Sequence, residues 1–158
     1  MLLRTPKGGV MPDKSTLENA REDRREGKAA STQAGEFVKE EMDHIREGKH
    51  GARSTKQAIA IGLSKARRAG VKLPPPKKGK ASGRAREQAA RDARRGKTPG
   101  RKPSPARSRA AERALKKEGR GAASKSSLAR HARRAAAKRS AAARSRSAKR
   151  AAATRKKK

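Results

Sequence analysis

Two histidines near the middle of the chain are the side chains best suited to metal chemistry. His44 lies between Asp43 and Glu47, and His50 follows after six residues. Two imidazoles with carboxylates nearby can hold a divalent metal ion. The same residues also fit the end of a capped helix whose charges are solvated, and we favour that interpretation. We therefore expect no metal site and no cofactor.

Other catalytic patterns in the sequence are incomplete. Gly96-Lys97-Thr98 resembles the end of a phosphate-binding loop, but Arg91 stands where that loop requires glycine, and no apolar strand precedes it. Acid–base catalysis requires carboxylates in a dry pocket, and Leu, Ile, Val and Phe together number only 14 of 158 residues. The absence of cysteine excludes thiolate chemistry and disulfides. We expect a protein that is not an enzyme.

The charge of the chain is large and unevenly distributed. Residues 1–47 hold 9 Lys and Arg against 10 Asp and Glu, a net charge of -1, whereas residues 48–158 hold 38 against 4, a net charge of +34. A polycation of this kind is typical of proteins that neutralise the phosphates of nucleic acids. His131 lies within the cationic part and can act as one more hydrogen-bond donor to phosphates.

The composition also indicates which polyanion is bound. The chain has no Trp or Tyr and one Phe, Phe37, whereas proteins that bind single strands stack the bases on aromatic rings. We therefore expect duplex DNA to be preferred, and double-stranded RNA remains an alternative. Membrane binding requires large apolar residues opposite the cations, and only two leucines occur from residue 81 onward. No apolar segment approaches the roughly 18 residues of a membrane span, so we expect a cytoplasmic protein without a membrane partner.

The clearest helix begins at Ser54. Ser54 and Gln57 have the spacing of a capping box. At the other end, Gly70 can take the left-handed C-terminal position, with Val71 in contact with Ala66. The Pro74-Pro75-Pro76 run prevents continuation.

Two further helices are expected before this one. A short helix should begin at Ser15 and end near Glu26, and an amphipathic helix should begin at Ser31 or Thr32. The amphipathic helix should expose an acidic face that contains Glu36, Glu40, Glu41, Asp43 and Glu47. Its apolar face should pack on the helix that follows, through Phe37, Val38, Met42, Ile45, Ile59 and Leu63.

These patterns predict an all-α fold: a small helical hairpin or three-helix unit, followed by a mostly disordered, helix-prone basic tail. Helix signals recur in the tail, at Ser82 and at Ser104-Pro105, but alanine faces are too shallow to form a core. The expected segments are a flexible lead at 1–12, a helical domain at 13–73, a Pro/Gly/Lys linker at 74–83 and a basic Ala/Arg/Lys tail at 84–158.

The nucleic-acid-binding residues are expected among the cations from Lys56 onward, and the tail should become ordered on the duplex. The predicted contacts are Lys56, Lys65, Arg67, Arg68, Arg101, Arg107, Arg130, Arg133, Arg134, Lys138, Arg139, Arg144, Arg146, Lys149 and Arg150.

Residues 13–79 resemble a family of short basic bacterial proteins that share a domain of unknown function. The segment KQAIAIGLSKARRAG carries most of the resemblance, and RALKKEGRGAAS is similar to the same proteins. Members are often labelled plasmid stabilisation or histone-like, and the tail separately resembles linker-histone tails in its Ala/Lys/Arg composition. The resemblance implies a bacterial, cytoplasmic protein and carries over no catalytic residues.

We therefore expect non-catalytic, largely sequence-independent binding of double-stranded DNA, as in nucleoid-associated or histone-like proteins. One alternative is a protein-binding adaptor or plasmid-partition accessory, with a partner or a second copy bound through residues 33–66. Another alternative is a basic protein associated with ribosomal RNA.

Overall fold

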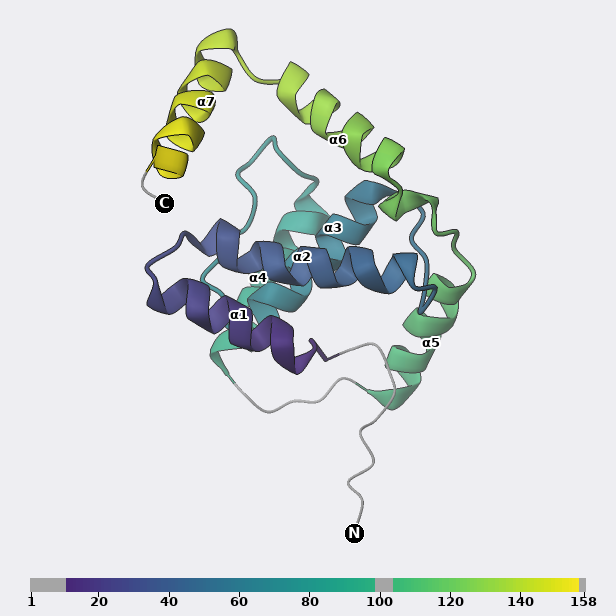
Figure 1. Ribbon diagram of the computed structural model, residues 1–158. Coiled ribbons are helices and arrows are strands. Elements are labelled where there is room, and N and C mark those ends of the chain that lie inside the picture. Colours follow the sequence, from purple (N-terminus) through teal and green to yellow (C-terminus); the bar gives the residue numbers. More distant parts are fainter. Residues whose placement is uncertain (1–10, 99–103, 157–158) are drawn as a thin grey trace. The chain divides into compact units, whose positions relative to one another are not determined.

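The computed structural model describes residues 11–98 and 104–156 (Figure 1). Over these ranges the chain forms seven α-helices, one 3-10 turn and no β-strand. Most of the predicted lead at 1–12, together with Arg101, lies outside the described residues. The helices are α1 (Lys14–Arg25), α2 (Ala30–Arg46), α3 (Thr55–Arg68), α4 (Gly83–Lys97), α5 (Pro105–Lys116), α6 (Lys125–Ala137) and α7 (Ala141–Lys156), and the 3-10 turn η1 is Gly121–Ala123.

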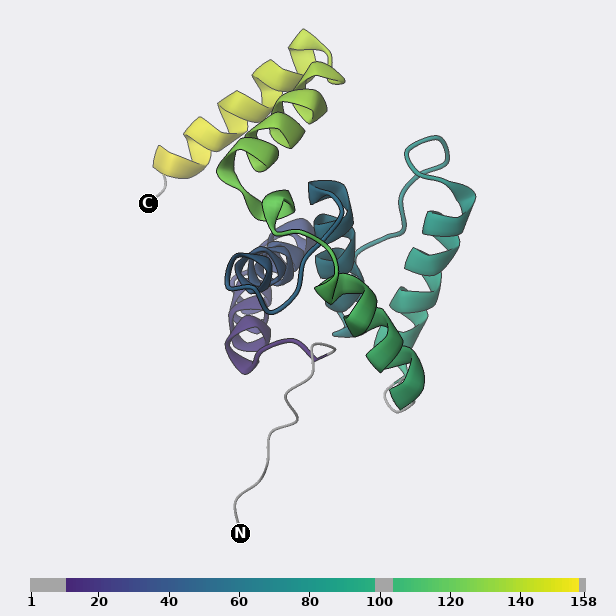
Figure 2. The same ribbon diagram turned by 90° about the vertical axis from the view of Figure 1, so that its right-hand side faces the viewer.

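The chain divides into two compact units, of which the first ends at Ala123 and the second begins at Ser124. Within the first unit α1 packs on α2, α2 on α3 and α3 on α4. Figure 2 shows these four helices following one another across the unit. The second unit consists of α6 and α7.

The prediction of an all-α protein is confirmed, but the prediction of a mostly disordered tail is wrong. Four helices occur after residue 83 in the described ranges, and α4 packs against α3. Alanine and arginine have high helix propensity, and three of these helices have serine caps. Ser82 Oγ accepts from the Ala85 amide, Ser124 Oγ from the Ser127 amide and, for α7, Ser140 Oγ from the Ala143 amide, each at 3.2 Å.

Helix α3 begins and ends as predicted. The Ser54 hydroxyl accepts from the Gln57 amide at 3.2 Å. Gly70 has φ +92°, and the Val71 amide donates to the Ala66 carbonyl at 3.1 Å, which is a Schellman ending. The starts predicted for the two earlier helices are displaced by one or two residues, because α1 and α2 have no side-chain cap.

The Ser54 cap gives a first testable prediction. Replacing Ser54 with alanine removes the acceptor of an otherwise unpaired amide and should cost about 1 kcal/mol of unfolding free energy. Ser15→Ala is the matched control, because Ser15 is an exposed residue in the first turn of α1 and caps nothing. Urea unfolding should show a lower free energy of unfolding for Ser54→Ala than for Ser15→Ala. Equal losses of unfolding free energy in the two variants would contradict the capping role.

The buried face of α3 differs from the predicted one. Ala58 and Gly62 are buried, whereas Ile59 and Leu63 are only half-buried. A Cβ placed on Gly62 would lie 2.7 Å from the Val38 Cα, so the α2 and α3 backbones approach closely there. Small residues permit this approach, and the larger apolar side chains lie beside the line of contact rather than on it.

A segment of the predicted tail completes the first unit. The amides of Gly51 and Ala52, between α2 and α3, donate to the carbonyls of Leu115 and Gly119 at 2.9 and 3.1 Å. The Thr55 hydroxyl donates to the Ala122 carbonyl at 2.6 Å. Residues 115–123 therefore belong to the same packed unit as α2 and α3.

Candidate functional site

The second unit carries many cations and no carboxylate side chains. Residues 125–156 contain 12 Lys and Arg and no Asp or Glu. Helix α7 has no apolar face, so its cations point in all directions. Every predicted contact in this unit is exposed, namely Arg130, Arg133, Arg134, Lys138, Arg139, Arg144, Arg146, Lys149 and Arg150.

The first unit contributes fewer exposed cations than predicted. Lys56 on α3 and Arg107 on α5 are exposed. Lys65 and Arg67 are buried, with 4 % and 6 % of their surface exposed, which is unfavourable for the phosphate contacts expected of them. Arg68 is half-buried and donates to the Ser64 carbonyl at 3.4 Å.

Arg67 serves the end of its own helix. Its guanidinium donates to the carbonyls of Leu73 and Pro74 at 3.2 and 3.3 Å. Burial lowers the pKa of Arg67 from its ordinary value, and Asp92 opposes that effect. The side chain thus holds the Pro-rich segment against the C-terminus of α3.

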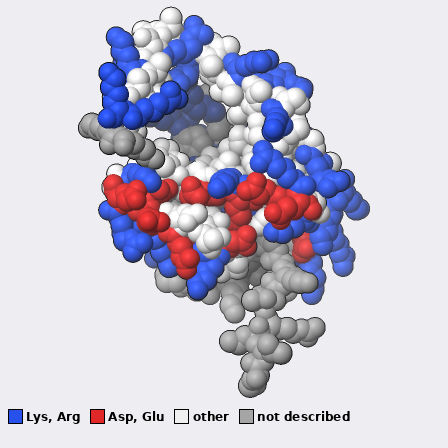
Figure 3. Space-filling model, viewed as in Figure 1, with Lys and Arg blue, Asp and Glu red and all other residues white. Residues whose placement is uncertain are grey.

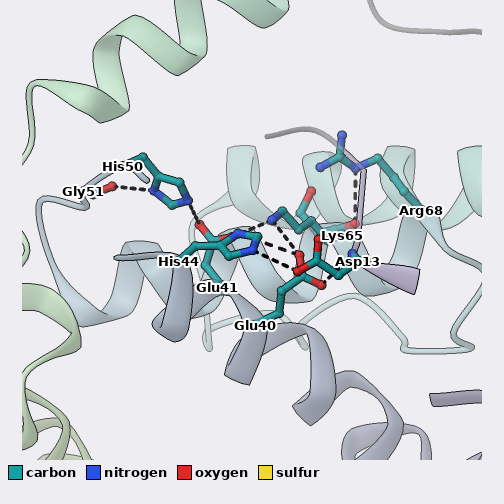
Figure 4. A network of polar contacts seen from close by, with 9 residues as sticks. Asp13, Glu40, Glu41, His44, His50, Gly51, Lys65 and Arg68 are labelled. Atoms are coloured by element: carbon teal, nitrogen blue, oxygen red, sulfur yellow. Dashed lines mark hydrogen bonds and ion pairs between the residues drawn. The ribbon is translucent and has the colours of Figure 1, made fainter. Parts of the chain in front are cut away.

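The acidic face predicted for α2 is partly buried. Glu41 has no exposed surface and Glu40 has 6 %. Lys65 on α3 lies between them, with Nζ 2.8 Å from Glu41 Oε2 and 3.3 Å from Glu40 Oε1 (Figure 4). Neither carboxylate oxygen of Glu41 accepts a hydrogen bond of good geometry from the described residues, so this side chain is held by ion pairing alone.

Both histidines join this network, which contradicts the expectation of a solvated helix end. His44 Nε2 lies 3.2 Å from Asp13 Oδ2, and its Nδ1 lies 3.9 Å from Glu40 Oε1. His50 Nδ1 lies 3.1 Å from the Gly51 carbonyl oxygen, and its Nε2 lies 3.4 Å from Glu41 Oε1. Asp43 is half-buried and Glu47 exposed, and neither is part of the cluster.

A second buried carboxylate joins α3 to α4. Asp92, 2 % exposed, accepts from the Ser64 hydroxyl at 2.7 Å and from the Gln88 amide group at 3.1 Å. Arg68 Nε lies 4.0 Å from Asp92 Oδ1. Asp92 therefore fixes a helix that the sequence had assigned to the tail.

An acidic pocket lies between α1 and α2. It has a volume of about 200 Å³, and Figure 3 shows Asp and Glu side chains gathered over these helices on the face in view. Asp13, Glu40 and His44 line it, so it opens onto the buried network. Its other lining residues are Ser15, Thr16, Asn19, Glu36, Lys39, Asp43, Glu47 and Lys49.

Sequence reasoning missed Glu40, Glu41 and Lys65 as a buried cluster. Glu41 follows Phe37 by four residues, and Lys65 follows Gly62 by three, so both lie on the helix faces that meet. The signal was present in this spacing. It was overridden by the usual rule that charged residues lie outside.

Comparison with known proteins identifies one related segment. Residues 25–78 match a family of unknown function (DUF6496), which confirms the resemblance to a family whose domain has no assigned role. The matched segment contains α2, α3 and the Glu40–Lys65 ion pair, but neither Asp13 nor Asp92. No curated protein and no solved structure matches the chain. No helix in the described ranges has both the length and the apolar character needed to cross a membrane.

Proposed function

We propose that this protein is a non-catalytic, largely sequence-independent binder of double-stranded DNA that acts by neutralising phosphates. The observation that supports the proposal is the exposed, unpaired set of cations on α6 and α7. Within residues 104–156 only one ion pair forms, between Lys116 and Glu112. Cations without carboxylate partners can release the counterions of a nucleic acid without first breaking an ion pair.

The helical form of this unit favours a duplex. Alanine side chains separate the cations, and the unit contains no Phe, Tyr or Trp on which bases could stack. The lack of an apolar face on α7 is unfavourable for insertion into a lipid surface. A nucleoid-associated, histone-like role in a bacterial cytoplasm is the setting that this proposal implies.

The protein-partner alternative has less support. Phe37, Met42 and Ile45 are buried in the first unit, and Val38, Ile59 and Leu63 are half-buried there. In the described ranges, Met11 is the only large apolar side chain that is exposed. The apolar residues of 33–66 therefore serve the chain's own packing.

The proposal is tested by salt dependence in the full chain. We compare an Arg130→Gln, Arg133→Gln, Arg134→Gln variant with the unaltered protein by fluorescence anisotropy, over a salt series. Each lost phosphate contact should reduce the slope of log K against log salt by about 0.9 on DNA. The triple variant should therefore lose about 2–3 units of slope.

The matched control removes three exposed arginines from α1. An Arg21→Gln, Arg24→Gln, Arg25→Gln variant changes the net charge equally, and its slope should stay within about half a unit of the original. Equal effects of the two triplets would indicate only a general charge effect. A matched RNA duplex that binds more tightly than DNA would favour the ribosomal-RNA alternative.

A further inference from the structure

The hydrogen bonding of His50 leaves one ring nitrogen facing a carboxylate. The Gly51 carbonyl can only accept, so the proton of a neutral His50 must be on Nδ1, 3.1 Å away. Nε2 then carries a lone pair, and it faces Glu41 Oε1 at 3.4 Å. Two acceptors in this position repel each other unless a cation lies between them.

His44 has the same arrangement. Its Nε2 lies 3.2 Å from the Asp13 carboxylate, which fixes the proton on that nitrogen. Nδ1 then carries a lone pair, and it lies 3.9 Å from Glu40 Oε1, next to Glu41 in the chain. A histidine that donates one N–H to a carboxylate or carbonyl and leaves the other nitrogen free has the outer-shell geometry of a metal ligand.

The charges of the network do not balance without a further cation. Asp13, Glu40 and Glu41 contribute three negative charges, and Lys65 contributes one positive charge. With both imidazoles neutral, the buried groups Glu40, Glu41 and Lys65 sum to -1, and the exposed Asp13 at the edge of the network brings the total to -2. One divalent cation would neutralise this cluster.

We infer that Glu41, His44 and His50 form a binding site for a divalent transition-metal ion, with Zn²⁺ as the expected occupant. Each of the three offers a ligand atom, and these atoms lie within 4.8 Å of one another. Two imidazoles and one carboxylate are a zinc ligand set that keeps a fourth position open. Glu41 is fully buried, and although Lys65 pairs with its Oε2, no hydrogen-bond donor among the described residues serves its Oε1, which indicates a missing partner on that oxygen.

Lys65 is compatible with this ion. Its Nζ contacts Oε2 of Glu41, whereas Nε2 of His50 faces Oε1. The two carboxylate oxygens can therefore bind the ammonium group and the metal ion separately. Asp13 and the Gly51 carbonyl orient the two imidazoles from behind. The acidic pocket between α1 and α2 reaches His44, one of the three proposed ligands, from the side of Asp13.

The alternative to a metal ion is a proton on each free imidazole nitrogen, which would make each histidine an imidazolium. A Co²⁺ titration of the chelator-treated full chain distinguishes the two. We expect one Co²⁺ per chain, with the intense visible absorption of four-coordinate cobalt, and its displacement by Zn²⁺. If the protein bound neither Co²⁺ nor Zn²⁺, the proposal would be overturned.

The chain has three histidines and no cysteine, so single substitutions can separate the proposed ligands from the one remaining histidine. His50→Gln and Glu41→Gln should each weaken Zn²⁺ binding at least about 100-fold, since loss of an outer-shell partner alone costs about 10–100-fold. His131→Gln is the matched control and should bind as the unaltered protein does. Loss of binding in His131→Gln, or full binding in His50→Gln, would contradict the site.

A variant-free measurement covers the case in which a substitution unfolds the protein. Zn²⁺ should shift the imidazole NMR signals of His44 and His50 in the unaltered chain and leave that of His131 in place. Equal shifts of all three signals would show surface binding instead. Zn²⁺ should also raise the midpoint of thermal unfolding, because its ligands tie α2 to the segment that follows it.

Discussion

Replacing Lys65 with methionine should lower the free energy of unfolding by about 3–5 kcal/mol. Lys65 is the cation that lies between Glu40 and Glu41, and both carboxylates are almost fully buried. Methionine keeps much of the side-chain volume but leaves the carboxylates without their ammonium partner. The measurement is urea unfolding followed by far-UV circular dichroism.

Lys56→Met is the matched control for this experiment. Lys56 lies on the same helix but is exposed, so its loss should change stability by less than about 0.5 kcal/mol. A combined Glu40→Gln, Glu41→Gln, Lys65→Met variant should regain much of the loss, since no buried charge is left unpaired. A Lys65→Met effect no larger than that of Lys56→Met would show that the buried ion pair does not form.

Gly62→Ala should destabilise the first unit by about 1–3 kcal/mol. The added methyl would lie 2.7 Å from the Val38 Cα and 3.0 Å from the Phe37 carbonyl oxygen. Both are backbone atoms, so no side-chain rotation can relieve the overlap and the two helices must separate. A lower urea midpoint with an unchanged m value would be the signature.

The same substitution in α2 should have the opposite sign. Gly35 is exposed, and a Cβ there would meet nothing within 4 Å. Gly35→Ala should therefore stabilise the protein by about 0.5–1 kcal/mol, because alanine loses less backbone entropy in a helix. If both glycine variants were stabilised, α2 and α3 would not cross at Gly62.

Local signals in the sequence predicted where several helices begin or end. Ser54, Ser82 and Gly70 act through neighbouring backbone groups, so their effect can be inferred without knowledge of the tertiary structure. Ser15 has a similar pattern but does not cap α1, because the chain already enters the helix at Asp13. A cap pattern thus locates a helix end to within about two residues.

Long-range packing could not be predicted in the same way. The apolar stripe Ile59 and Leu63 suggested that the largest side chains face α2, but the closest contact is made by Gly62. Once two backbones approach this closely, charged residues beside the contact are buried as well. Glu41 and Lys65 are tolerated there because they are buried together.

The order of the tail was underestimated for a related reason. Its helices contain only two large apolar residues, Leu115 and Leu128. Helix α4 is instead attached through Asp92 and Ser64, and residues 115–123 through carbonyl groups. Polar attachment of this kind has no hydrophobic pattern in the sequence. Of the predicted phosphate contacts that the structure describes, those on α6 and α7 are exposed, and only Lys65 and Arg67 are buried.

The attachment of residues 115–123 to the loop before α3 also affects how the protein folds during synthesis. Thr55 binds the Ala122 carbonyl, 67 residues later in the chain. At about 5–20 residues per second, the ribosome needs roughly 3–13 s to make this stretch. During that interval α2 and α3 exist without their last partner, while the cations of α4 and α5 emerge. The first unit should therefore reach its final stability only after Ala123 has left the ribosome.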